Sequence, residues 1–395
     1  MRNKLPVAAI ALAALMTGCN NTTVSNRIEL PGTVDSEAFA ANIESISVMN
    51  LQMDDDLALT DLPFMTVTDN YIYLLDNPLH MGNSRLRLMC FDKQTGDKLA
   101  ARSIEGRGPG EIASTLMINI FGIGDSLGIH SMSNTILCDH NCMGVSNLDI
   151  FDGFIDKVFR LRNGKYALYS LMGFGDHYME IIDDSLNVVS QHFNAISGNS
   201  SQPEFCVNND TLRFVYSAVN QLFTFYDGTE HCTELAVPNP MTPELFMKAV
   251  LEHKSLTDLR KEYDGLFSGL QESGRFLTLQ YSVENQFYTA LIDKRTNKAI
   301  SYLRSNNEGE FKTSDILFRL MAGSIYSDGK YIYNQLRNEL VANLLEGHDD
   351  LLDTRLKKTQ AEYRAYLERN AEYIKSLEPE ERDAANVILK IKLKD

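Results

Sequence analysis

Two cysteines and a histidine lie within five residues of one another, at Cys138, His140 and Cys142. Thiolate and imidazole groups at this spacing can bind zinc, but a structural zinc site normally has four ligands, usually arranged as two pairs. His130 is the nearest residue that offers a fourth ligand. A Cys138–Cys142 disulfide and two unlinked thiols in a loop are the alternatives. We expect no metal here, and these three residues are the candidates if one binds.

A second candidate is a glycine-rich segment whose backbone amides could cradle a phosphate. It consists of Gly106, Arg107, Gly108, Pro109, Gly110 and Glu111. Phosphate loops of this kind lead into a helix whose N-terminus faces the anion, and no helical pattern follows Glu111. We therefore interpret the segment as a structural corner. The glycines permit left-handed backbone, Glu111 accepts backbone amides, and Arg107 pairs with a carboxylate.

The charge of the chain limits its partners. The sequence holds 53 acidic and 37 basic residues, which gives a formal net charge of −16. Nucleic-acid binding requires clustered lysine and arginine side chains that neutralise phosphates. We expect no nucleic-acid partner, and no cofactor motif is evident.

The N-terminal segment has the pattern of a processing signal. Residues 1–18 contain two basic residues before a short apolar run, as in a signal peptide. The small residues just before Cys19 resemble the lipobox of bacterial lipoproteins, which implies that Cys19 is lipidated and anchors the chain to a membrane. Ordinary secretion is the alternative. We expect residues 19–40 to be a flexible tether, and the protein to lie in the bacterial cell envelope, on its periplasmic face or outer surface.

Short β-strands are the elements that must position these residues. Runs rich in β-branched and aromatic residues recur from about residue 43 and are separated by Asn-, Asp- and Gly-containing turns. The runs fall into groups of four, and the groups repeat every 40–50 residues or so. Four short antiparallel strands per repeat predict an all-β fold, a six-bladed β-propeller over residues 41–395.

Three further segments complete the predicted architecture. Residues 242–265 are expected to form a small helical insertion, because Thr242 and Pro243 give a helix start. Residues 354–378 have apolar residues at helical spacing and predict a C-terminal helix on the propeller rim. Residues 386–393 predict a closing strand. A ring must join its first and last blades, and we expect both ends of the chain to take part.

The glycine-rich corner also resembles a known family. Together with the Phe-Asp-Lys-x-x-Gly turn at residues 91–96, it is similar to the corner of six-bladed β-propeller lipoproteins related to the NHL and TolB-like propellers. The resemblance covers most of the chain from about residue 40. It implies a lipid-anchored propeller, in a family mostly of unassigned function, and it transfers no catalytic residues.

These observations favour a non-enzymatic binding protein whose partner is a small molecule, a glycan or a protein. The alternative is an envelope hydrolase, lyase or lactonase with a metal or carboxylate site at the central channel. Three or more Asp, Glu, His or Asn side chains that converge in the channel would favour the enzyme. A scaffold whose C-terminal helix docks a partner is a third possibility.

Overall fold

The structure is a computed structural model of the 395-residue chain. It describes residues 24–33, 35–52, 64–76, 86–114, 116–148, 150, 154–196, 199, 201, 203–305, 324–336 and 387–395. The predicted signal peptide, Cys19 and the predicted rim helix at residues 354–378 lie outside the described residues.

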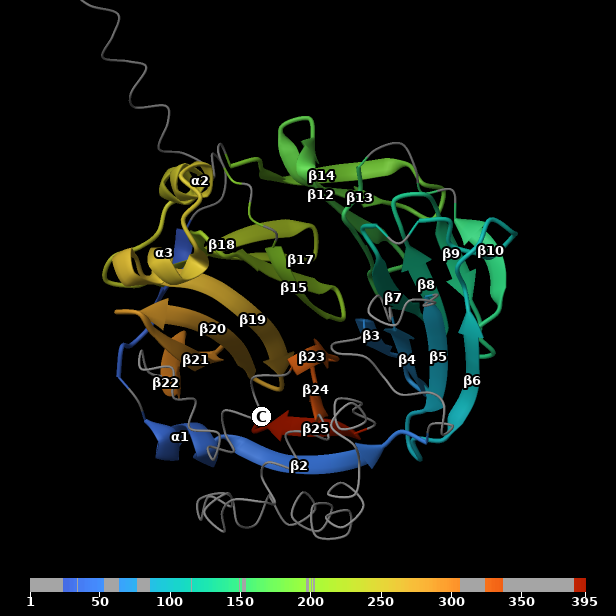
Figure 1. The fold of residues 1–395 in the computed structure, drawn as a ribbon, viewed down its shortest axis with the longest axis horizontal. Helices are drawn as coiled ribbons and strands as arrows, with labels where there is room; N and C mark the ends of the chain where they lie inside the picture. The colour runs from blue at the N-terminus through green and yellow to red at the C-terminus, as the bar shows by residue number, and fades with distance from the viewer. Residues whose placement is uncertain are drawn as a thin grey trace, which may run out of the picture.

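Six sheets stand in a ring around one axis, as Figure 1 shows, and each is built on four antiparallel strands. Blades 1 to 3 consist of β3 (Phe64–Val67), β4 (Tyr71–Asp76), β5 (Arg87–Asp92) and β6 (Lys98–Ser103); β7 (Asn119–Ile123), β8 (Ser126–His130), β9 (Thr135–Cys138) and β10 (Gly144–Leu148); and β11 (Lys157–Arg160), β12 (Tyr166–Phe174), β13 (His177–Ile182) and β14 (Val188–Asn194). Blades 4 to 6 consist of β15 (Pro203–Asn208), β16 (Thr211–Tyr216), β17 (Val219–Tyr226) and β18 (Thr229–Ala236); β19 (Gly265–Ser273), β20 (Phe276–Val283), β21 (Gln286–Asp293) and β22 (Lys298–Ser305); and β23 (Ser324–Ser327), β24 (Ile332–Leu336), β25 (Val387–Leu393) and β2 (Ile43–Asn50). The predicted six-bladed propeller is confirmed.

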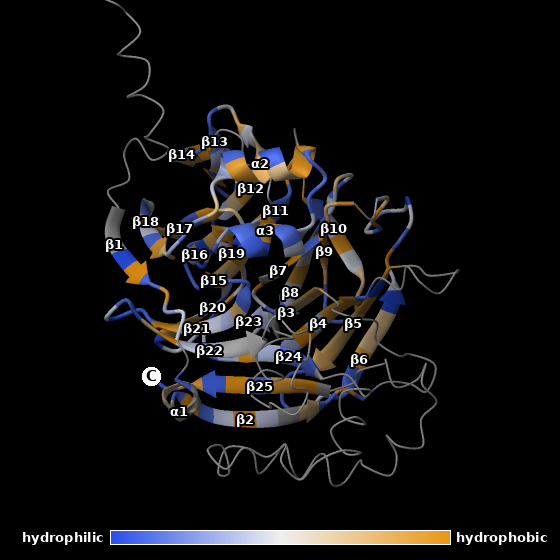
Figure 2. Ribbon diagram, turned by 60° about the vertical axis from the view of Figure 1, so that its left-hand side comes forward, coloured by the Kyte–Doolittle hydropathy of each residue, from blue (hydrophilic) through white to orange (hydrophobic). Residues whose placement is uncertain are grey.

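Each blade packs both of its faces against neighbouring blades, so its middle strands are buried on two sides. In β4, Ile72 and Leu74 pack in a cluster that includes Ile388 of blade 6. Tyr73 and Leu75 point the other way and pack in a cluster shared with blade 2. Successive side chains of a strand alternate between the two faces, which explains why the middle strands are continuous hydrophobic runs in the sequence. Figure 2 shows this apolar colouring along the strands of the sheets.

The sixth blade is built from both ends of the chain. Its order is β2-β25-β24-β23, so the outermost strand comes from the N-terminal region and the other three from the C-terminal region. β2 and β25 are antiparallel, with Ile46 opposite Ile391. β25 lies where the closing strand was expected at residues 386–393, and β2 satisfies the outer edge of β25, which would otherwise be unpaired.

Residues 24–41 differ from the tether that the sequence predicts for residues 19–40. β1 (Val24–Glu29) pairs in parallel with β18 as a fifth strand on blade 4. Ile28 is 1% exposed in this position. The helix α1 (Ser36–Ala41) follows and buries Phe39 completely, with its ring 5.6 Å from that of Tyr302. Burial of apolar side chains such as Ile28 and Phe39 holds this segment against the propeller. The polar residues 20–26 at its start led to the prediction of a tether instead.

A helical insertion between blades 4 and 5 occupies the region where the sequence predicts one. It consists of α2 (Pro243–Leu251) and α3 (Leu256–Glu262). The side chain of Thr242 caps α2, as its position before Pro243 suggests. Ser255 and Asp258 form a reciprocal capping box at the start of α3.

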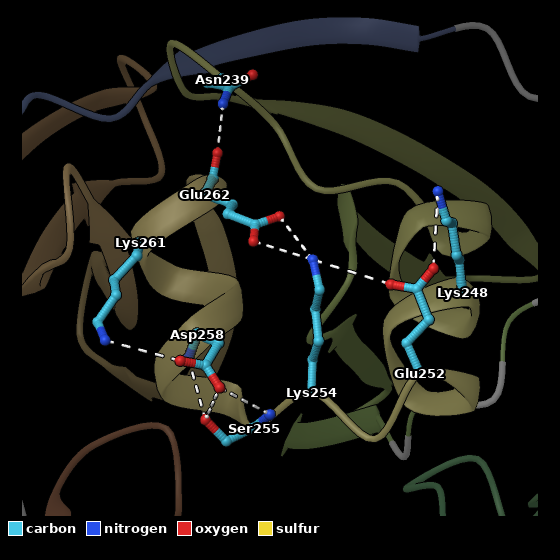
Figure 3. A network of polar contacts seen from close by, with 8 residues as sticks. All are labelled: Asn239, Lys248, Glu252, Lys254, Ser255, Asp258, Lys261 and Glu262. Carbon is cyan, nitrogen blue, oxygen red and sulfur yellow. Dashed lines mark hydrogen bonds and ion pairs between the residues drawn. The ribbon is translucent and has the colours of Figure 1, made fainter.

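The exposed side of the insertion carries a network of charged side chains, drawn in Figure 3. Lys254 lies between the helices, 2.9 Å from Glu262 and 3.9 Å from Glu252. The amide of Asn239 donates a hydrogen bond of 2.7 Å to the Glu262 carbonyl. Exposed ion pairs contribute little to stability, so the apolar side of the insertion must hold it to the propeller. That side buries Ala218, Met241, Ala249, Leu259 and Leu266 in one cluster. No helix among the described residues is long and apolar enough to cross a membrane.

We predict that Ile391→Ala weakens the whole propeller, because the side chain is fully buried in the closing blade. Truncating a buried isoleucine side chain beyond its Cβ should lower the free energy of unfolding, measured by urea titration, by about 2–4 kcal/mol. Val145→Ala is the control, since Val145 is 60% exposed on the outermost strand of blade 2. Equal effects of the two substitutions would contradict the closing role of β25.

Candidate functional site

The innermost strands of all six blades line a central channel of about 750 Å³. These strands are β3, β7, β11, β15, β19 and β23. Contacts between neighbouring blades show that they run in the same sense. The turns that follow β3 and β7 are joined by the bond from Asn70 to Asp125 at 2.7 Å, and Asn163 after β11 donates to Asp210 after β15 at 3.1 Å. The channel therefore has an N-terminal end, where the inner strands begin, and a C-terminal end, where they finish.

Aromatic side chains line much of the channel wall near the N-terminal end. Phe64, the first residue of β3, is 40% exposed. Phe159 and Phe205 come from the neighbouring strands β11 and β15, and their ring centroids are 4.9 Å apart. Lys157, the first residue of β11, reaches toward blade 1, and its ammonium lies 5.9 Å from the centroid of the Phe64 ring. These rings form an apolar patch beside the Lys157 ammonium, in a channel whose lining is otherwise largely polar, and such a patch can hold the flat part of a small organic ligand.

Three acidic residues of the described chain line the channel, Asp69, Glu204 and Asp328, and the last two are hydrogen-bonded within the protein. Glu204 accepts hydrogen bonds from the backbone amides of Gly269 and Leu270 in blade 5. Asp328 accepts from the Tyr333 hydroxyl at 2.8 Å and from two backbone amides of its own turn. Carboxylates held in this way fix the positions of strands.

The cations of the channel differ in how they are paired. Lys93 lies 3.8 Å from Asp328 and donates to a backbone carbonyl, and Arg160 is bound to Asp184 at 2.7 Å. Lys157 forms no ion pair with the residues that the structure describes. Burial lowers the pKa of Lys157, and the neighbouring Asp156 carboxylate acts in the opposite direction. Lys157 is therefore a partly desolvated cation. The Asp156 carboxylate also accepts a hydrogen bond of 2.6 Å from the Leu171 backbone amide.

A buried carboxylate beside the channel joins blades 4, 5 and 6. The side chain of Glu272, 2% exposed, forms ion pairs with Arg213 of blade 4 and Lys294 of blade 5. It also accepts a hydrogen bond of 2.9 Å from Asn208. Its backbone amide donates to the Ser327 hydroxyl of blade 6 at 3.1 Å. A buried charge is tolerated only when it is paired and hydrogen-bonded, and Glu272 meets both conditions.

The structure does not assemble a metal site from Cys138, His140 and Cys142. Both thiols are buried and unlinked, which is one of the alternatives open from the sequence. Burial raises the pKa of Cys138 to about 12, which favours the protonated thiol. His140 is exposed and stacks on Tyr71, with ring centroids 5.4 Å apart. Across the described part of the chain, no three His, Cys, Asp or Glu side chains are grouped closely enough to hold a metal.

His130 forms hydrogen bonds that connect two blades of the propeller. Its Nε2 donates to the backbone carbonyl of Ile155 at 2.9 Å, and its Nδ1 is 2.8 Å from the Thr135 hydroxyl. Since a carbonyl oxygen only accepts, this pattern leaves Nδ1 as the acceptor. Burial lowers the pKa of His130, which favours the neutral ring. His130 therefore ties blade 2 to the segment that enters blade 3.

The glycine-rich corner is structural, as its sequence suggests. Glu111 accepts the amide of Gly108 at 2.7 Å, so the carboxylate closes its own loop. Gly110 has φ +75° and lies against Gly144 at the start of β10. A Cβ on Gly110 would come 2.7 Å from the Gly144 Cα. Arg107 is exposed and does not form the predicted ion pair with any described residue. The corner thus binds the blade 1–blade 2 connection to the outer strand of blade 2.

Sequence reasoning missed the residues that line the channel. Phe64, Lys157 and Glu204 carry no motif, and each lies at or next to the start of an innermost strand. Their common position is the signal that could have found them. It becomes visible only when the six blades are aligned strand by strand.

Comparison with known proteins decides the family. A model of the DUF5128 family, described as a 6-bladed beta-propeller, matches residues 19–333. The chain belongs to this family. Its relation to the NHL and TolB-like propellers stays a prediction. No curated protein matches the chain.

Two solved structures are similar to this DUF5128 chain. A candidate exported protein from Bacteroides fragilis shares 15% sequence identity at a TM-score of 0.64, with 93% of this chain and 99% of that chain covered. A DUF4221 family member from Bacteroides vulgatus shares 9% identity at a TM-score of 0.47, with 89% and 98% covered. At 15% identity the first likeness supports the fold and nothing further about activity.

We predict that Gly110→Ala destabilises this propeller more than Gly228→Ala does. Both glycines have a positive φ, at +75° and +72°, but a Cβ on Gly228 would meet nothing within 4 Å. The left-handed backbone alone costs an alanine about 1–2 kcal/mol. The contact with Gly144 should add about 1–3 kcal/mol to the loss in urea-induced unfolding for Gly110→Ala. Equal losses of unfolding free energy in the two variants would mean that the backbone around Gly110 and Gly144 moves apart without an energetic penalty.

Proposed function

We propose that this DUF5128 propeller is a lipid-anchored protein of the bacterial cell envelope that binds a small-molecule ligand in its central channel, without catalysing a reaction on it. The channel carries the proposal. A volume of about 750 Å³ lies within the range of small-molecule sites, and all six blades contribute to its wall. Aromatic surfaces with a few polar groups are the usual lining of such sites.

The state of the channel carboxylates supports binding over the alternative of a hydrolase, lyase or lactonase. Those reactions need acids, bases or metal ligands that converge on a substrate. Glu204 instead holds backbone amides of blade 5, and Asp328 holds amides of its own turn, which leaves Asp69 as the one lining carboxylate without a hydrogen bond among the described residues. Among the described residues, the channel presents no group of three metal-ligating side chains.

The envelope location rests on the N-terminal sequence. Met16, Thr17 and Gly18 precede Cys19, which is the order in which lipoprotein signals present the cysteine for lipidation. The similar protein from Bacteroides fragilis is described as a candidate exported protein, which is consistent with this location. A single acyl chain binds a membrane weakly, so stable anchoring would use more than one chain at Cys19.

The channel can be tested with a reporter, because the chain contains no tryptophan. In Phe64→Trp the only indole lies at the N-terminal end of the channel, where Phe64 is 40% exposed and has room for the larger ring. Compounds that raise the melting temperature in a chemically diverse screen should shift the emission of this variant. They should leave unchanged the emission of Tyr226→Trp, whose site is 55% exposed on blade 4 outside the channel lining. Hits that shift only the second variant would contradict channel binding.

The anchor is tested at Cys19. Cys19→Ser should abolish the incorporation of labelled palmitate and release the protein from the membrane fraction of cells, because the acylated thiol is gone. Asn20→Ser, one residue further along, should keep both properties. A Cys19→Ser protein that stays labelled and membrane-bound would refute lipidation at this residue.

A further inference from the structure

We propose that Lys157 binds the anionic group of the channel ligand, and that the same ligand carries an aromatic or similarly flat apolar group which packs on Phe64. This inference rests on the proposed function and adds the chemical class of the ligand. It assigns a role to a side chain that no sequence motif marks.

The first support is the balance of charges at the N-terminal end of the channel. Lys157 and Glu204 are the charged side chains that line it there. Glu204 accepts hydrogen bonds from the amides of Gly269 and Leu270 and forms no ion pair with Lys157. Lys157 forms no ion pair within the described chain, whereas the channel cations Lys93 and Arg160 each have a carboxylate. Arg162 also lines the channel without an ion pair to a described residue, but it follows β11 and so lies toward the C-terminal end. An anionic ligand would supply a partner that the described residues do not.

The second support is the partial burial of this ammonium. Taking a cation out of water costs free energy that the protein recovers only through an opposite charge or hydrogen bonds. The Asp156 carboxylate next to Lys157 is already bonded to the Leu171 amide. The desolvation of Lys157 is thus a cost that the folded chain carries, and a carboxylate or phosphate group of a ligand would offset it.

The third support is the group of aromatic rings near the Lys157 ammonium. Its nearest aromatic surface is the Phe64 ring, 5.9 Å from Nζ to the ring centroid, and this ring is 40% exposed. Phe159 and Phe205 extend the apolar wall from the neighbouring strands. An exposed phenyl ring at a channel mouth is costly in water, so a flat apolar group that covers it gains free energy. The anion and the ring of one ligand would then be held by residues of blades 3 and 1.

The experiment uses the full chain and four small probes in isothermal titration calorimetry. Phenylacetate and phenyl phosphate carry both features, phenylacetamide lacks the charge, and acetate lacks the ring. We expect the two aromatic anions to bind about tenfold or more tightly than phenylacetamide, and acetate not to bind measurably. The comparison of phenylacetate with phenyl phosphate shows which anionic group the site prefers.

Variants then assign the effect to Lys157. Lys157→Met should weaken the binding of the aromatic anions by about tenfold or more and leave phenylacetamide within about twofold. Lys157→Arg, which keeps the charge, should restore most of the affinity. Lys248→Met removes the same charge from the surface of α2, where that side chain is 71% exposed, and should change nothing.

Each other outcome overturns the inference in a recognisable way. If phenylacetate and phenylacetamide bind equally and both shift the emission of Phe64→Trp, the channel is a binding site but Lys157 does not select an anion. If the probes bind without shifting that emission, both the inference and channel binding fail for these ligands. If no aromatic anion binds at millimolar concentration, the inference is wrong while channel binding of another ligand class stands.

Discussion

The antiparallel pairing of β2 with β25 is the interaction on which the rest of the molecule depends. It joins segments more than 300 residues apart, with Ile46 opposite Ile391. Without it β25 would be an unpaired edge, and blade 6 would lack its outermost strand. The channel depends on this closure as well, because β23 of blade 6 and β3 of blade 1 are neighbours only in a closed ring. The chain therefore gains its candidate site and its global stability from the same backbone hydrogen bonds.

The closing strand pair alone does not fix the shape of the channel. Ion pairs and hydrogen bonds between neighbouring blades also position its inner strands. Glu272 draws Arg213, Lys294 and Asn208 to one buried point and so locks blades 4 and 5 together. His130 connects blade 2 to the entry of blade 3 through a neutral ring. The hydrophobic effect that packs the blades together is non-directional, whereas these hydrogen bonds and ion pairs are directional. The inner strands are consequently held at set heights along the axis, which is what a binding site made from several strands requires.

The parts of the fold that are local in sequence could be predicted from it. Strand periodicity indicated the number of blades, and Thr242 and Pro243 marked the start of the helical insertion. The parts that depend on distant partners could not. β1 is a strand because β18 offers it a parallel edge some 200 residues away, and the contact of Gly110 with Gly144 is equally remote. The role proposed for Lys157 could not be predicted from the sequence either, since it depends on the Phe64 ring of another blade.

The acidity of the chain and a cationic channel are compatible because the two act over different distances. At physiological salt, charges separated by more than about 8 Å are largely screened in water. Four strands at about 4.8 Å spacing place the outer edge of a blade about 14 Å from its inner strand. Carboxylates on the outer strands therefore have little effect on a small anion in the channel, where Lys157 acts at contact. A polyanion that must cover the outside of the protein meets the full charge of −16. The net charge that led us to expect no nucleic-acid partner is therefore compatible with a small aromatic anion in the channel.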